Sequence, residues 1–314
     1  MSIADRLQYA RKRSGLTGPR VKELTRIGES SLSELEHGRR EPRLSQLQAL
    51  AQAYQRSVAF FLEDGPIPEE LVLWRQKPEE AADEVEGRFL RLCEQYHNLE
   101  VWCNERTPIE LPEAQNKGRA FGYPDAEELA KSVRRELQLG DRPAYSLLPA
   151  LEEACGVKVF HLDFEPTGTA ACTRSQTFGV AVLLNPKSLR WRRNHDLAHE
   201  LFHLLTWGLF RAGEGQSCVP GRDEEKLATC FARNLLMPAE ATRTAINERT
   251  RGGRISFEDL FDVARQFDVS IESLLWQMHF LYGRGQDDTV RTEREIEKAK
   301  ELAPLLEERQ HEKP

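Results

Sequence analysis

Residues 192–205 read RRNHDLAHELFHLL and predict a helix with one apolar face. His199 and His203 are four positions apart, so both imidazoles lie on one side of that helix and can bind the same metal ion. Glu200 lies beside them without being a ligand, where it can take a proton from a water molecule on the ion. The pattern indicates a metal centre that activates water.

The third ligand of such a centre must come from elsewhere, because a catalytic zinc ion usually has three protein ligands and a water molecule. The next predicted helix, about residues 224–236, begins with Glu224 and Glu225. Both lie at the edge of its apolar stripe, so periodicity does not choose between them. The helix dipole also favours acidic residues in any first turn, which would leave both without a metal role.

A third histidine, His195, shares the helical face of His199, four positions earlier. It is a candidate to support a ligand or to contact a substrate. The alternative is an exposed polar neighbour with no role in the site.

Hydrophobic patterning predicts few strands and many helices, which indicates an α+β, mostly helical fold with a small sheet. The expected strands are residues 157–162, 170–173 and 178–184. The expected helices after residue 64 are 88–102, 126–139, 144–154, 188–207, 224–236, 256–267 and 271–282.

Four segments are expected along the chain. Residues 1–64 hold several short helices with a tight turn, which is typical of an all-α helix-turn-helix domain. Residues 65–124 begin with Gly-Pro-Ile-Pro and are expected to connect and brace the parts on either side. Residues 125–285 form the α+β domain, and residues 286–314 form a charged tail, either a solvated helix or a frayed end.

Composition excludes several classes of protein. Of the 314 residues, 30% are charged and 39% hydrophobic, with no apolar run long enough for a membrane span and no secretory signal, so a cytoplasmic protein is expected. Residues 1–64 carry 11 basic and 8 acidic residues, a net charge of +3, on a chain of net charge −7. Contact with nucleic acid is therefore expected only at that end.

Two passages together resemble the ImmA/IrrE metallopeptidases. One is the helix RRNHDLAHELFHLL, and the other is EKLATCFARNLLMP at residues 225–238. The resemblance covers about residues 125–285 and implies a zincin-like metallopeptidase domain. Asp196 departs from the family, which often has a threonine or a similar small residue there.

The same resemblance implies a ligand set. Zn²⁺ would be held by His199, His203 and an acid, with Glu200 as the catalytic base. Aligning the second passage gives Glu225 as the third ligand and Glu224 as the runner-up.

Residues 4–64 resemble the XRE, phage-repressor-like, helix-turn-helix family. The resemblance is carried by Gly-Leu-Thr at 15–17, Glu-Leu-Thr at 23–25 and LEHGRREP at 35–42. It implies DNA binding, with candidate contacts at Ser30, Ser31, Ser33, Arg39 and Arg40.

Four departures weaken the DNA-binding expectation. Gly18 stands where the family often has a glutamine, and Lys22 where it has an alanine. Glu29 and Glu34 lie in the expected recognition helix and repel phosphate, although a glutamate can accept from cytosine. The alternative role is dimerisation or docking of a partner protein; a homodimer that reads two half-sites is also expected of this class.

The first functional hypothesis is a zinc-dependent endopeptidase that cleaves a protein, targeted by its amino-terminal domain. Extended substrate could pair with an exposed strand edge near residues 178–184. In the resembled family the substrate is typically a repressor, often itself of the helix-turn-helix class. Its cleavage relieves repression after stress or during induction of a mobile element.

The second hypothesis is a DNA-binding regulator or antitoxin-like protein. Its metallopeptidase-like domain would sense a ligand or a partner without proteolysis. Both hypotheses accept zinc, and Glu200→Gln separates them, because only the first requires that carboxylate.

Overall fold

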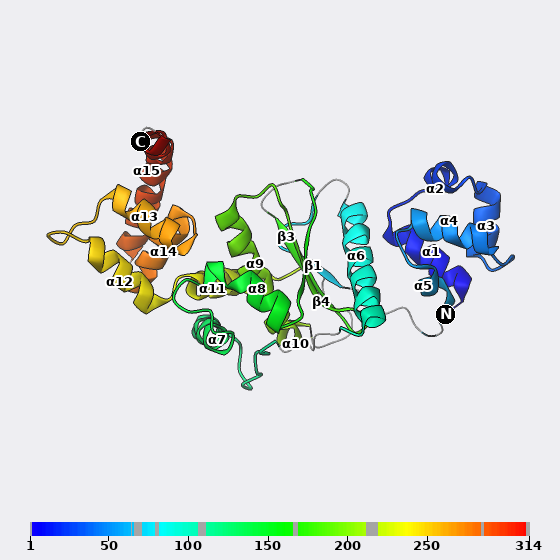
Figure 1. The fold of residues 1–314 in the computed structure, drawn as a ribbon, viewed down its shortest axis with the longest axis horizontal. Helices are drawn as coiled ribbons and strands as arrows, with labels where there is room; N and C mark the ends of the chain where they lie inside the picture. Colours follow the sequence, from blue (N-terminus) through cyan, green and yellow to red (C-terminus); the bar gives the residue numbers. More distant parts are fainter. Residues whose placement is uncertain are drawn as a thin grey trace.

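The computed structural model describes residues 2–63, 65, 71–78, 82–105, 111–165, 169–211, 219–283 and 286–311. The described chain is mostly helical with one small sheet, so the expected α+β class is confirmed (Figure 1). None of its described helices is long and apolar enough to cross a membrane.

Five short helices form the amino-terminal unit: α1 (Ile3–Arg13), α2 (Gly18–Thr25), α3 (Glu29–Glu36), α4 (Leu44–Ala53) and α5 (Val58–Leu62). The first begins at a capping box in which Ser2 and Asp5 bond each other's backbone N–H. Gly15 follows it at φ 64°, a left-handed conformation that ends a helix and favours glycine. Apolar side chains such as Leu7 and Leu50 give this unit its own core.

The sheet has four strands in the order β1-β3-β4-β2: β1 (Val72–Trp74), β2 (Lys158–His161), β3 (Ala170–Ser175) and β4 (Gly179–Leu184). β3 pairs antiparallel with both β1 and β4, whereas β2 pairs parallel with β4. Consequently β4 is an inner strand, and the expectation of an exposed strand edge at residues 178–184 is wrong. Its unbroken apolar run, Val180–Leu184, is typical of a strand covered on both faces.

Helices cover both faces of the sheet (Figure 1). Alternate residues such as Cys172 and Val182 join the core on the side of α9 (Arg190–Leu205), whereas Ala171 and Leu183 join the core on the side of α6 (Ala82–Cys103). The remaining helical segments of this part are α7 (Tyr123–Glu136), η1 (Pro143–Tyr145), α8 (Leu147–Pro149), the π-helical η2 (Ala150–Ala154), α10 (Trp207–Phe210) and α11 (Arg222–Leu236).

The segment expected only to connect and brace also contributes to the sheet. Its strand β1 pairs with β3 in the register Val72 to Thr173. A strand of three residues is too short to show an alternating pattern, which is why the sequence did not predict it. The other element of this segment, α6, begins six residues before its expected start at Arg88.

Four helices form the carboxyl-terminal part: α12 (Ala239–Arg249), α13 (Phe257–Phe267), α14 (Ile271–Tyr282) and α15 (Gln286–His311). Patterning did not predict α12. The charged terminal segment is a helix whose Ile296 and Ala299 are buried in the main core, so it is more than a solvated tail. The boundaries of the four expected segments stay predictions.

Candidate active site

Helix α9 places His199, Glu200 and His203 inside the domain. All its residues from Asp196 to Leu205 are buried, because the apolar side chains between the histidines pack against the sheet. The three polar side chains are at most 1% exposed. Buried imidazoles and carboxylates cost free energy unless they are paired or bind a metal ion, so this cluster requires partners.

The partners come from the first turn of α11. Glu225 Oε2 lies 3.1 Å from His199 Nε2, and Glu225 Oε1 lies 3.2 Å from His203 Nε2. The potential ligand atoms of these three residues all lie within 4.8 Å of one another. Two packed helices therefore direct two imidazoles and one carboxylate toward one point.

Glu224 has a different position. Its Oε1 lies 2.9 Å from His203 Nδ1, and both its carboxylate oxygens accept from Arg211 Nη2, at 2.9 and 3.0 Å. A carboxylate on one imidazole nitrogen fixes the tautomer and leaves the other nitrogen free for a metal ion. The geometry thus distinguishes the two acids, with Glu225 facing both Nε2 atoms and Glu224 behind His203.

The donor set fits a divalent ion such as zinc. His203 Nε2 and Glu225 Oε1 are buried and close together, yet among the described residues neither has a partner with hydrogen-bond geometry. Two such atoms lie close together without hydrogen-bond geometry when both are directed toward a shared position, such as that of a metal ion, and not toward each other. Two histidines and one glutamate are one of the ligand sets that catalytic zinc sites use.

The charges of the metal-free cluster follow from burial and pairing. Burial opposes a charged His203, but its hydrogen bond with Glu224 and the carboxylate of Glu225, 3.2 Å from its Nε2, outweigh that cost and raise its pKa to about 9. Burial lowers the pKa of His199 to about 4. Burial acts to raise the pKa of Glu225, but its hydrogen bond with His199 and the close contact with His203 lower it to about 2. A metal ion therefore has to displace a proton from His203.

Glu200 is suited to proton transfer. Burial raises its pKa to about 7, although His203 and the Cys172 thiol on β3 act in the opposite direction. Neither of its carboxylate oxygens has a partner with good hydrogen-bond geometry among the described residues. A carboxylate with a pKa near neutrality and no fixed partner can both accept and release a proton.

His195 lies one turn before His199, with the ring centroids 6.1 Å apart. Arg75 Nη1 lies 3.5 Å from His195 Nδ1 and 2.5 Å from Asp196 Oδ1, so it contacts both neighbours. Burial, together with the charges of Arg75 and His199, holds the pKa of His195 well below its usual value. Because an arginine can only donate, Nδ1 is the acceptor and Nε2 carries the proton of a neutral ring.

The candidate DNA contacts lie on the surface of the amino-terminal unit, on α3 and the turn after it. They are the exposed Ser30, Ser33, Arg39 and Arg40 and the half-buried Ser31. Helix α3 is on the side of this unit away from α6 (Figure 1). Glu29 and Glu34 are exposed on the same helix, whereas Glu36 is buried and paired with Arg11 at 2.6 Å.

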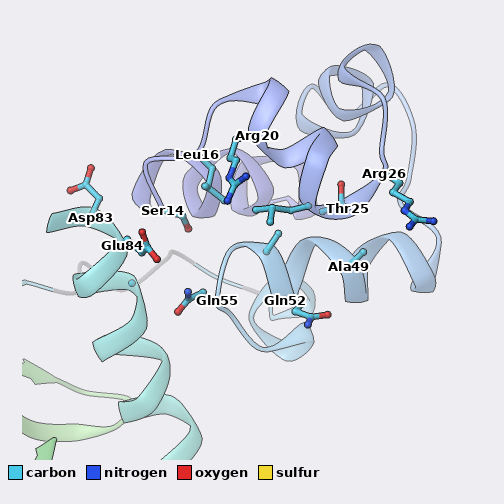
Figure 2. Close-up of a pocket in the computed structure, with 13 residues that line it drawn as sticks. Ser14, Leu16, Arg20, Thr25, Arg26, Ala49, Gln52, Gln55, Asp83 and Glu84 are labelled. Atoms are coloured by element: carbon cyan, nitrogen blue, oxygen red, sulfur yellow. The ribbon is translucent and has the colours of Figure 1, made fainter. Parts of the chain in front are cut away.

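Charged contacts join the amino-terminal unit to α6. Arg56 Nη1 lies 2.5 Å from Glu94 Oε1, and Arg13 pairs with Glu86. Figure 2 shows the groove between the two parts, about 510 Å³ in volume and bordered by the charged residues Arg20, Arg26, Asp83 and Glu84. The amino-terminal unit and α6 contribute to separate apolar cores.

Comparison with known families identifies both parts. Residues 2–59 match the helix-turn-helix domain family, and residues 152–279 match the peptidase family described as the IrrE N-terminal-like domain. The second match contains α9 and α11 and therefore the whole histidine–glutamate cluster. The chain thus carries a helix-turn-helix domain followed by an IrrE N-terminal-like domain, and both resemblances noted in the sequence are confirmed.

Comparison with individual proteins adds less. No curated protein matches the chain closely enough to count as a relative. A solved structure, Bacillus thuringiensis PlcR in complex with the peptide PapR7 and DNA, aligns at 13% identity over 95% of this chain and 98% of that one. Its TM-score is 0.19, a value too low to carry an argument about fold or function.

Three residues of the site had no signal in the sequence. Arg75 follows a strand that patterning missed, and Arg211 follows the short helix α10. Cys172 lies on a predicted strand, but nothing in its spacing relates it to Glu200. Each reaches the site through tertiary packing, which spacing along one helix cannot reveal.

Proposed function

We propose that this protein is a zinc-dependent endopeptidase that cleaves a regulatory protein, with the helix-turn-helix domain directing it to DNA or to a DNA-bound target. The observation that carries the proposal is the convergence of His199, His203 and Glu225 within 4.8 Å, beside the buried Glu200. The match of residues 152–279 to a peptidase family supports the same class of reaction.

In this proposal His199 and His203 would hold the ion through Nε2, and Glu225 would hold it through its carboxylate. Glu224 would fix the ring of His203 through the 2.9 Å contact at Nδ1, and Arg211 would fix Glu224. A bound zinc ion supplies Lewis acidity, which polarises a peptide carbonyl and acidifies water.

Glu200 would move the proton. Its carboxylate takes a proton from the attacking water and later gives it to the leaving nitrogen of the peptide, so the charge of Glu200 is restored after each cycle. A pKa of about 7 before the metal binds places this group near the pH at which both transfers are possible. His195, with its proton on Nε2, is a candidate donor to the carbonyl oxygen as negative charge develops there.

An extended substrate would pair with β1, which is an edge strand of the described sheet although its side chains are buried. This edge strand pairs with β3 on one side only within the described sheet. Its C-terminal neighbour Arg75 contacts His195 and Asp196 of α9, which brings that edge close to the metal centre. Backbone hydrogen bonds to an edge strand would hold the peptide extended, as cleavage requires.

The amino-terminal domain is proposed to bind DNA through α3 and the turn after it. The exposure of Arg39 and Arg40 supports this role, and the exposed Glu29 and Glu34 limit the affinity for phosphate. A helix-turn-helix repressor is the substrate that the resemblance implies, and cleavage would then relieve repression.

The proposal is tested on the zinc-loaded full chain with a proteome-derived peptide library, in which new peptide termini are read by mass spectrometry. We expect cleavage by the wild type, none after chelation, and none by the Glu200→Gln variant with its zinc retained. Equal cleavage by wild type and Glu200→Gln, or no cleavage by the zinc-loaded wild type, would overturn the proposal. A DNA-dependent phenotype that survives Glu200→Gln would then favour a non-proteolytic regulator.

A further inference from the structure

A cavity of about 860 Å³ opens beside the proposed metal centre, between α7, α11 and α14. Glu225 and His195 form the wall nearest the centre. The cavity is larger than one amino-acid side chain, so it has room for a side chain together with part of the neighbouring peptide. A substrate held at the centre would therefore place a residue next to the scissile bond in this cavity.

Aromatic rings and the guanidinium of Arg233 form the rest of the lining that an occupant would meet. Trp276 is half-buried, and Tyr123 and Phe280 are exposed at the rim. The guanidinium carbon of Arg233 lies 4.0 Å from the ring centroid of Phe280, a cation–π contact. An occupant would thus meet apolar surface along its stem and a positive charge at one end.

Arg233 is held in place without a negative partner. Its Nε donates to Gln277 Oε1 at 3.0 Å, and Gln277 Nε2 in turn donates to the backbone oxygen of Met237 at 2.9 Å. Its Nη2 lies 3.7 Å from Cys230 Sγ, a weak acceptor. Within the described ranges no carboxylate forms an ion pair with Arg233, and its Nη1 has no hydrogen bond.

None of the other charged residues of the cavity lining forms an ion pair with Arg233 among the described residues. Lys226 pairs with Asp223 at 3.0 Å, and Arg222 adds a further positive charge at the mouth. The acids of the lining are Glu225, which faces the two histidines, and the exposed Glu127, whose charge acts on Arg233 without an ion pair among the described residues. Arg233 is half-buried, and this burial lowers its pKa.

We propose that this cavity is a specificity pocket for an acidic side chain of the substrate, and that Arg233 binds its carboxylate. The inference rests on the proposed peptidase function and names the substrate class of the same site. A planar guanidinium held at one edge by Gln277 presents its remaining N–H groups in the geometry that a carboxylate accepts. The cleaved proteins would then carry an aspartate or glutamate beside the scissile bond.

The test uses the same peptide library with the zinc-loaded full chain. We expect aspartate and glutamate to be enriched at one fixed position next to the cut. Arg233→Gln should lower kcat/KM for an acidic peptide about tenfold to a hundredfold relative to its amide counterpart. Arg233→Glu should shift the preference at that position to lysine and arginine. Arg243→Gln, on α12 and outside the cavity lining, is the matched control and should leave the preference unchanged.

A binding measurement separates recognition from chemistry. The Glu200→Gln variant should bind a fluorescein-labelled acidic peptide from the library more tightly than its glutamine analogue, as read by fluorescence anisotropy. Adding Arg233→Gln should remove that difference, whereas adding Arg233→Lys should keep part of it because the charge remains.

The outcomes distinguish the two proposals. No cleavage by the zinc-loaded wild type contradicts the peptidase function. Cleavage without acidic enrichment, or an acidic preference that survives both Arg233→Gln and Arg233→Glu, overturns the pocket assignment and leaves the peptidase function intact. If Arg233→Gln fails to fold, the reversal expected of Arg233→Glu and the retention expected of Arg233→Lys decide the same question.

Discussion

The metal centre and the recognition surface of the helix-turn-helix domain use polar residues in opposite ways. In the centre, His199, Glu200 and His203 are almost fully buried, and two helices direct them toward one point. On the recognition surface, residues such as Arg39 and Arg40 are exposed to solvent. No common point of contact for their side chains is present within the described chain. The fold alone sets the geometry of the first site, whereas a partner must set that of the second.

This difference predicts the conditions under which a substitution has a measurable effect. A change in the buried cluster removes a partner from a group that has no water to replace it, so its effect does not depend on a second macromolecule. A change on the exposed surface leaves a solvated side chain behind and becomes visible only when nucleic acid is present.

Among substitutions that keep the three proposed ligands, the largest effect on zinc affinity is expected of Glu224→Gln. The variant keeps all proposed zinc ligands but weakens the contact that fixes His203, and removing such a supporting carboxylate costs about tenfold to a hundredfold in metal affinity. A competition titration with a zinc indicator measures this. Asp223→Asn, one residue earlier and exposed, is the matched control and should bind zinc as the wild type does. Equal affinities in the two variants would contradict the assigned role of Glu224.

The protonation of His203 gives the next effect. Its pKa of about 9 in the metal-free protein means that zinc must displace a proton at neutral pH, so apparent zinc affinity should rise with pH. His199, with a pKa of about 4, is already neutral at neutral pH and therefore adds nothing to the pH dependence of zinc affinity. Between the pKa of Glu200 and that of His203, from about pH 7.5 to about pH 8.5, we expect about tenfold tighter binding per pH unit, with about one proton released per zinc ion. Calorimetry in buffers of different ionisation enthalpy counts that proton, and a flat pH dependence would argue against the paired His203.

The smallest effect is expected on the exposed surface. The Arg39→Ala, Arg40→Ala double variant should weaken binding to a random-sequence DNA duplex and reduce the salt slope of log K by about one for each phosphate that the protein no longer neutralises. Zinc content should not change. Arg243→Ala, on the carboxyl-terminal part, is the control for loss of positive charge. An unchanged salt slope in the double variant would remove these two arginines from the DNA interface.

The sequence predicted the elements of the centre because they depend on spacing within single helices. His199 and His203 share one face of α9, and the acids at the start of α11 follow from its apolar stripe. The choice between Glu224 and Glu225 required the packing of α11 against α9. A position at the edge of the apolar stripe specifies which side of the helix a residue lies on, but not which residue it contacts.

Other features depend on contacts between distant parts of the chain and were not predicted. Arg75 contacts Asp196 across 121 positions, and it comes from the segment that was expected only to connect the domains. The position of β4 inside the sheet follows from the pairing of β1 and β2 at the edges, which no local pattern encodes. Residues 30, 31, 33, 39 and 40 were placed by resemblance, and their contact with DNA stays a prediction.

The central claim, that two histidines and Glu225 hold a zinc ion, is tested most directly by elemental analysis of the purified full chain. We expect about one zinc ion per chain in the wild type, much less in Glu225→Ala, and a wild-type content in the Asp223→Ala control. A wild type without zinc after metal-replete expression, or a Glu225→Ala variant that keeps its full content, would contradict it.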